Sequence, residues 1–148
     1  MRFAVGSDHA GFPLKELLRE HLEKSDNEVV DLGTYDESPV DYPDYGAAVG
    51  RAVVAGDAEV GVCVCGTGIG ISIAANKIRG VRAAVVHDVS SARLAKHHND
   101  ANVVCFGGRL VGDVVALDAI DAFIESSFDG GRHEVRIEKI AALDSERP

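Results

Sequence analysis

A cysteine followed at once by a glycine-rich turn is the part of this sequence best suited to chemistry. Cys65 closes the apolar run 60–64, which is typical of a buried parallel strand, and a helix is predicted over 71–77. Glycines let a backbone approach a ligand closely, and the free N–H groups at the start of a helix attract anions. Such donors also favour the thiolate, which is the reactive form of a cysteine. The stretch therefore predicts chemistry on a negatively charged molecule. The residues of the turn are Gly66, Thr67, Gly68, Ile69 and Gly70.

Better-known glycine-rich motifs do not fit this turn. A P-loop would close with Gly-Lys-Ser/Thr, and a dinucleotide fingerprint would read G-x-G-x-x-G rather than G-x-G-x-G. A cysteine phosphatase would need an arginine about six positions after the thiol, where Ile71 stands. On these residues alone, a tight strand-to-helix turn with a buried, inert cysteine remains an open alternative.

Composition limits the classes of function. The 148 residues are expected to form one domain, 1–148, with a substantial core. The net charge of −9 argues against a nucleic-acid or membrane partner. Three cysteines on apparent strands favour a reducing, cytoplasmic location over a disulfide framework. The first residues continue directly into a strand and show no signal-peptide pattern, and no apolar run approaches membrane-spanning length.

Hydrophobic periodicity predicts strands that alternate with helices. Strands are expected over 2–6, 28–32, 60–65, 83–86 and 103–106. Helices are expected over 12–23, 41–55, 71–77, 89–96, 111–126 and 132–142. This alternation predicts an α/β domain in which helices cover both faces of a five-stranded parallel sheet, followed by a C-terminal helical tail.

Other polar residues stand at predicted connections. Asp8 and His9 follow the first strand, at the sheet edge that also carries Cys65, where open α/β sheets bind ligands. The run 96–100, Lys-His-His-Asn-Asp, is placed between a helix and the fifth strand. Paired histidines raise the question of a metal, but neither H-x-H nor a Cys/His quartet is present, so no metal site is expected.

A basic cluster and two further cysteines complete the candidates. The basic cluster is Arg132, His133 and Arg136. Arg132 and Arg136 are spaced i, i+4, so on a helix they share one face and could clamp a phosphate. A solvated surface helix explains the same spacing and remains open. Cys63 and Cys105 lie inside apolar runs and are expected to be structural.

Six short motifs occur in order along the chain: GSDHAG at 6–11, DYP at 41–43, CGTGIG at 65–70, AANK at 74–77, HND at 98–100 and GGRH at 130–133. Together they resemble one enzyme family, the type B ribose-5-phosphate isomerases, which are relatives of the galactose-6-phosphate and allose-6-phosphate isomerases. The resemblance covers essentially the whole chain. It implies a Rossmann-like three-layer α/β/α sandwich, a phosphosugar substrate, no cofactor or metal, and a homodimer with active sites built from both subunits. Whether dimers pair into tetramers stays open.

The resemblance also implies roles for individual residues. Cys65 would be the base that moves a proton between C1 and C2, Thr67 and the N–H groups of 66–70 would stabilise the enediolate, and His98 would open the furanose ring. One branch of the family uses a glutamate where this chain has Ile71, so the chain falls in the cysteine branch. The other implied contacts are Asp8 with the ring oxygen and C1 hydroxyl, Tyr42 and Asn99 with the sugar, and His9, Arg109, Arg132 and Arg136 with phosphate.

The expected activity is the interconversion of ribose 5-phosphate and ribulose 5-phosphate. Two alternatives stay open at this stage. A six-carbon phosphosugar isomerase would need a roomier sugar pocket. A phosphate- or nucleotide-binding regulatory module would use the glycine-rich turn without turnover, although it would need neither Cys65 nor His98.

Overall fold

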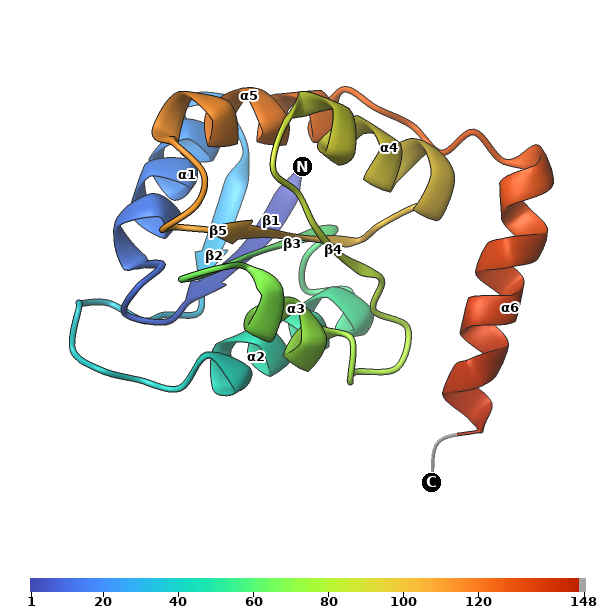
Figure 1. Ribbon diagram of the computed structural model, residues 1–148, viewed down its shortest axis with the longest axis horizontal. Helices are drawn as coiled ribbons and strands as arrows, with labels where there is room; N and C mark the ends of the chain where they lie inside the picture. Colours follow the sequence, from blue (N-terminus) through green and yellow to red (C-terminus); the bar gives the residue numbers. More distant parts are fainter. Residues whose placement is uncertain (147–148) are drawn as a thin grey trace.

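Five strands form one parallel sheet in the computed structural model, which describes residues 1–146 (Figure 1). The order across the sheet is β2-β1-β3-β5-β4. Because every neighbouring pair is parallel, all the carboxyl ends lie at one edge. The bounds are β1 Arg2–Ser7, β2 Glu28–Asp31, β3 Val60–Cys65, β4 Ala83–Val85 and β5 Val103–Gly107.

Helices cover both faces of the sheet, which confirms the predicted three-layer α/β/α sandwich. α1, α4 and α5 pack on one face, and α2 and α3 pack on the other (Figure 1). The helices are α1 Phe12–Lys24, α2 Tyr42–Ala55, α3 Ile69–Ala75, α4 Val89–Asn99, α5 Asp113–Ile124 and α6 Glu134–Ser145, with a 3₁₀ turn at Gly131–His133. Among the described residues, no helix combines the length and the apolar character needed to cross a membrane.

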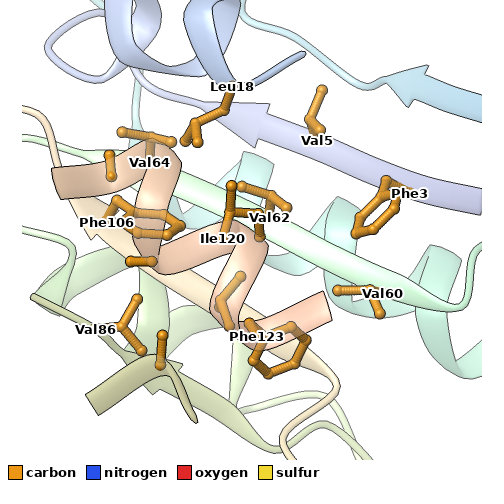
Figure 2. Close-up of a cluster of buried hydrophobic side chains, with 14 of the residues drawn as sticks. Phe3, Val5, Leu18, Val60, Val62, Val64, Val86, Phe106, Ile120 and Phe123 are labelled. Carbon is orange, nitrogen blue, oxygen red and sulfur yellow. The ribbon is translucent and has the colours of Figure 1, made fainter. Parts of the chain in front are cut away.

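The central strand β3 is buried along its whole length, as its apolar run predicted. Its side chains alternate between two cores. Val62 and Val64 point toward α1 and α5, where they meet Leu18, Phe106 and Ile120 (Figure 2). On the other face, Cys63 of β3 and Cys105 of β5 pack against residues of α2 and α3, among them Val49 and Ile71.

The structure corrects two predicted boundaries that bear on the site. α3 begins at Ile69 rather than 71, because Gly68, with a φ of 77°, ends the turn immediately before it. α4 continues to Asn99 rather than 96, since Asp88 caps its start and the left-handed Asp100 caps its end. His98 and Asn99 therefore lie on the last turn of a helix, not in a connection.

The C-terminal tail is helical, as predicted, but its α6 helix stands apart from the sandwich. α6 lies beside the sandwich rather than on either face of the sheet (Figure 1). None of its described residues is buried. One contact with the body is the Gly80 N–H donating to the Asp144 carboxylate at 2.7 Å. This arrangement leaves apolar side chains of α6 exposed, among them Val135, Ile140 and Leu143.

Ile120→Ala should destabilise the fold by about 3 kcal/mol, because it opens a cavity in the core between α5 and the sheet. Ile120 is 0% exposed, whereas Val114 on the same helix is 70% exposed. Val114→Ala is therefore the matched control and should change the free energy of unfolding by less than about 0.5 kcal/mol. Urea denaturation measures both. Equal losses in the two variants would contradict this view of the α5 packing.

Candidate active site

The carboxyl edge of the sheet holds a pocket of about 380 Å³. Three adjacent strands supply it: Asp8 follows β1, Cys65 ends β3 and Arg109 follows β5. The predicted site residues that the structure brings together here come from these strand ends, from the glycine-rich turn and from the start of α2. The lining residues are Asp8, Tyr42, Cys65, Gly66, Thr67, Ile69, Gly70 and Arg109.

The Cys65 thiol faces a backbone donor. The Gly68 N–H donates to its Sγ at 3.1 Å. Only 3% of the surface of Cys65 is exposed. A donor aimed at sulfur stabilises the thiolate more than the neutral thiol. One residue along, the Ile69 N–H donates to the Thr67 hydroxyl at 3.2 Å, and this fixes the exposed Thr67 at the rim. The turn can therefore support both a base and a developing negative charge.

Two glycines of the turn leave room for other site residues. A Cβ at Gly70 would lie 2.7 Å from the ring of Tyr42, so only glycine admits that ring. A Cβ at Gly66 would lie 3.3 Å from the guanidinium of Arg109. Tyr42, at the first position of α2, and Arg109 thus both reach the pocket across the backbone of the turn.

Asp8 and His9 are held by the loops around them. Asp8 is 7% exposed, and its Oδ1 accepts from the Gly11 N–H at 2.9 Å. This bond orients the carboxylate at the pocket wall. The ring of His9 contacts Val40, whose N–H lies 3.2 Å from Nδ1. His9 is thereby fixed to the loop that leads into α2.

A second group of predicted residues lies away from this pocket. His98, Asn99, Arg132 and Arg136 belong to the end of α4, the 3₁₀ turn and α6, and they are not among the residues that line it. The structure adds His133, which the sequence placed in the basic cluster but to which no role was assigned. His133 stacks on His98, with ring centroids 4.3 Å apart and planes inclined by 11°. The sequence feature that indicated His133 was its place in the GGRH motif.

His133 carries an electrostatic signature. It is 8% exposed, and burial lowers its pKa, with further lowering from the positive charges of His98, Arg132 and Arg136. These effects favour the neutral form of the His133 ring. Arg132 lies close enough for its Nε to donate to His133 Nε2 at 3.5 Å. This cluster, with two arginines beside it, suits an anion such as phosphate.

Within the described chain, the ligand atoms of His98, Asp129 and His133 all lie within 4.8 Å of one another and could in principle hold a metal ion. Two features favour another role. Asp129 already pairs with His97 at 2.8 Å, and the two other rings are stacked face to face instead of converging on one point. The neighbouring arginines would also repel a cation.

The family of this chain follows from a comparison with known proteins. A sequence model of one family, described as Ribose/Galactose Isomerase, matches residues 3–140. The chain belongs to this family. The matched range includes the residues that line the pocket. It also includes His98, Arg132, His133 and Arg136, which we call the histidine–arginine group. Membership in the ribose/galactose isomerase family confirms the enzyme class expected from the sequence, an aldose–ketose isomerase.

Individual members of the ribose/galactose isomerase family are similar over their full length. Ribose-5-phosphate isomerase B of Escherichia coli strain K12 is 44% identical over 146 residues, which cover 99% of this chain and 98% of that protein. The structure of ribose-5-phosphate isomerase B from Clostridium thermocellum matches with a TM-score of 0.98 and 45% identity, covering 99% of both chains. The Mycoplasma genitalium enzyme, solved with bound ribulose-5-phosphate, has a TM-score of 0.93 and 40% identity, covering 99% of this chain and 97% of its own.

The three thiols should differ in reactivity, and alkylation measures this. Iodoacetamide at pH 8 should modify Cys65 first, because it lines the pocket and has a backbone donor at its sulfur. Burial raises the pKa of the Cys105 thiol well above its usual range, and the adjacent Cys63 adds to the shift. Cys105 should therefore stay unmodified in the folded protein. Mass spectrometry identifies the sites, and modification of Cys105 before Cys65 would contradict the assignment.

Proposed function

We propose that this chain interconverts ribose 5-phosphate and ribulose 5-phosphate through an enediolate. The observation that carries the proposal is the Cys65 sulfur, which accepts an N–H bond from Gly68 at 3.1 Å inside a pocket that also holds Asp8 and Arg109. The names of the similar proteins support the substrate, since one of them was solved with ribulose-5-phosphate.

The cyclic aldose must first open. A proton leaves the C1 hydroxyl and another reaches the ring oxygen, so that C1 becomes an aldehyde. We assign this transfer to His98, because an imidazole ring can serve as both general acid and general base. Asp8, held by the Gly11 N–H, would contact the ring oxygen and the C1 hydroxyl. Tyr42 and Asn99 would contact the sugar hydroxyls.

Isomerisation follows on the open chain. The Cys65 thiolate takes the proton from C2, the electron pair forms the C1–C2 double bond, and the C1 oxygen becomes negative. The N–H groups of 66–70 and the Thr67 hydroxyl would stabilise that oxygen. The cysteine then returns its proton to C1, and the proton of the C2 hydroxyl moves to the C1 oxygen. The product is the ketose, with no atom gained or lost.

Phosphate binding divides between the two groups of residues. Arg109 lines the pocket of one chain, and His9 follows the lining residue Asp8, whereas Arg132 and Arg136 lie with His98, away from the pocket. A second copy of the chain, placed with its histidine–arginine group over the pocket, would complete the site. We therefore propose a homodimer with shared active sites. The exposed apolar residues of α6 support such an assembly.

The proposal includes a cytoplasmic location and a reaction that needs no cofactor or metal. All three cysteines are free thiols, which fits a cytoplasmic enzyme. In this scheme His98 and Cys65 carry the proton transfers of ring opening and of the C2-to-C1 step, the N–H donors stabilise the negative oxygen, and no step requires a cofactor or a metal.

Cys65→Ala should lower kcat by about three orders of magnitude, because a positioned base contributes on the order of 10²–10⁴-fold. Binding of ribose 5-phosphate should change only a few-fold, since the turn and the arginines remain. Exchange of the substrate C2 hydrogen with solvent deuterium, followed by NMR, should also stop. A coupled assay with ribose 5-phosphate, allose 6-phosphate and galactose 6-phosphate first establishes the substrate of the parent.

Cys63→Ala is the matched control for this variant. Cys63 is 0% exposed and lies two positions earlier on the same strand, but it faces the core. This substitution should keep turnover and exchange, and it should cost stability of about 1 kcal/mol. Turnover and exchange that persist in Cys65→Ala would show that the base is elsewhere.

Mixed dimers test the shared site. Cys65→Ala and His98→Asn, each inactive alone, should recover about a quarter of the parent activity when co-expressed, because random pairing gives mixed dimers with one complete site. Two differently tagged chains allow the mixed species to be purified and assayed. The control pair is Cys65→Ala with Thr67→Ala, whose lesions lie in the same pocket. That pair should recover nothing. A verified mixed dimer of the first pair without activity would refute sites built from both subunits.

A further inference from the structure

A fully buried lysine lies on α1, and it is not among the residues that line the pocket. The side chain of Lys15, on α1, is 0% exposed, and its Nζ lies 2.7 Å from an oxygen of Asp31 and 2.9 Å from Glu16. Lysines are almost never fully buried unless paired. Even a paired buried charge loses so much hydration that it adds little to stability over an apolar pair. The position of Lys15 therefore calls for an explanation other than stability.

The Lys15–Asp31 pair holds one turn of the loop between β2 and α2. Lys15 Nζ donates to the Thr34 carbonyl at 2.9 Å. Asp31 Oδ1 accepts from the Gly33 N–H at 2.9 Å. Both partners thus bind the backbone of residues 33–34, one from each side. The charges strengthen these bonds relative to neutral ones.

The backbone of residues 33–34 is also hydrogen-bonded to the end of β1. The Ser7 N–H donates to the Gly33 carbonyl at 2.7 Å, and the Thr34 N–H donates to the Ser7 carbonyl at 2.9 Å. Ser7 immediately precedes Asp8 and His9 in the chain. The backbone that carries these two site residues is therefore paired on one side with a turn that Lys15 fixes.

The other end of the same loop, before α2, also contacts a residue of the site. Val40 contacts the ring of His9 at 3.2 Å, and Tyr42 starts α2 two residues later. The loop over 32–41 is anchored at 33–34 and again at Val40. Each anchor adjoins a residue that the proposed function places against the substrate.

We propose that Lys15 and Asp31 are positioning residues that set Asp8, His9 and Tyr42 in the active site through the loop 32–41. Lys15 does not itself line the pocket. The inference rests on the proposed function of that pocket. A displacement of about 1 Å can cost on the order of 100-fold in rate, so a charge pair remote from the reacting atoms can still set catalytic efficiency.

The decisive variant is the double substitution Lys15→Met with Asp31→Leu. It replaces a buried ion pair by apolar side chains, an exchange that often preserves or raises stability, while it removes both bonds to the turn. The folded dimer should keep a Tm close to that of the parent, yet kcat/KM for ribose 5-phosphate should fall about 10- to 100-fold. The Thr34 amide should exchange with solvent at least about ten times faster, as measured by NMR.

Two single variants complete the test. Lys15→Met alone removes the Thr34 contact and leaves the Asp31 side chain, 22% exposed, in reach of water, so it serves if the double variant does not fold. It should show the same two effects. Glu16→Gln is the matched control, because Glu16 pairs with Lys15 but makes none of the contacts with the loop described above. It should leave kcat/KM and Thr34 exchange within about two-fold.

The outcomes separate this inference from the proposed function. Folded Lys15 variants with parental kcat/KM, or with lowered kcat/KM but parental Thr34 exchange, would overturn the positioning role. If the parent does not turn over ribose 5-phosphate, the proposed function fails. Thr34 exchange and the NMR signals of the His9 ring then decide on their own whether Lys15 sets the loop: changes in both support the role, and parental signals overturn it.

Discussion

The pairing of β3 between β1 and β5 is the constraint on which the site depends. Its register sets Ser7 opposite Val64 and Cys65 opposite Gly107. Because all three strands are parallel and buried, a slip of one residue would turn every core side chain of β3 to the wrong face. The apolar packing on both faces therefore fixes the depth at which the thiol emerges, relative to Asp8 on one side and Arg109 on the other.

The backbone of the sheet and of the turn therefore positions the reactive groups. The precision of the thiol comes from the sheet, and the donor at its sulfur comes from the backbone of the turn. Backbone donors do not need to be ordered by side-chain packing, so they cost little reorganisation when charge develops. Side chains are used where reach is needed, as in Arg109, which is exposed yet extends over Gly66.

Much of this arrangement could be predicted from the sequence because it follows from local pattern. The alternation of strands and helices indicated the sandwich, and the strand ends indicated which edge would carry Asp8 and Cys65. The end of α4 was harder to predict. The run 96–100 is polar and looks like a connection, but the helix continues through it and ends only at the left-handed Asp100.

Long-range contacts account for the remaining differences. Lys15 falls within an amphipathic helix, where a lysine is expected to face water. Nothing near it in the sequence indicates that Asp31 and the Thr34 carbonyl will close over it. The stacking of His98 on His133 likewise joins the end of α4 to a turn far along the chain. Pattern analysis identifies the residues in such pairs, but only the fold shows that they meet.

The ring of Tyr42 over Gly70 has a consequence for how this enzyme can evolve. The space between the two positions is so small that a methyl group at 70 would collide with the aromatic ring. A larger residue at 70 becomes acceptable only after position 42 has become smaller, although Tyr42 is one of the residues that line the pocket. The two positions, distant in the chain, must therefore change as a pair. A substitution that enlarges residue 70 is open only to a chain in which residue 42 is already smaller.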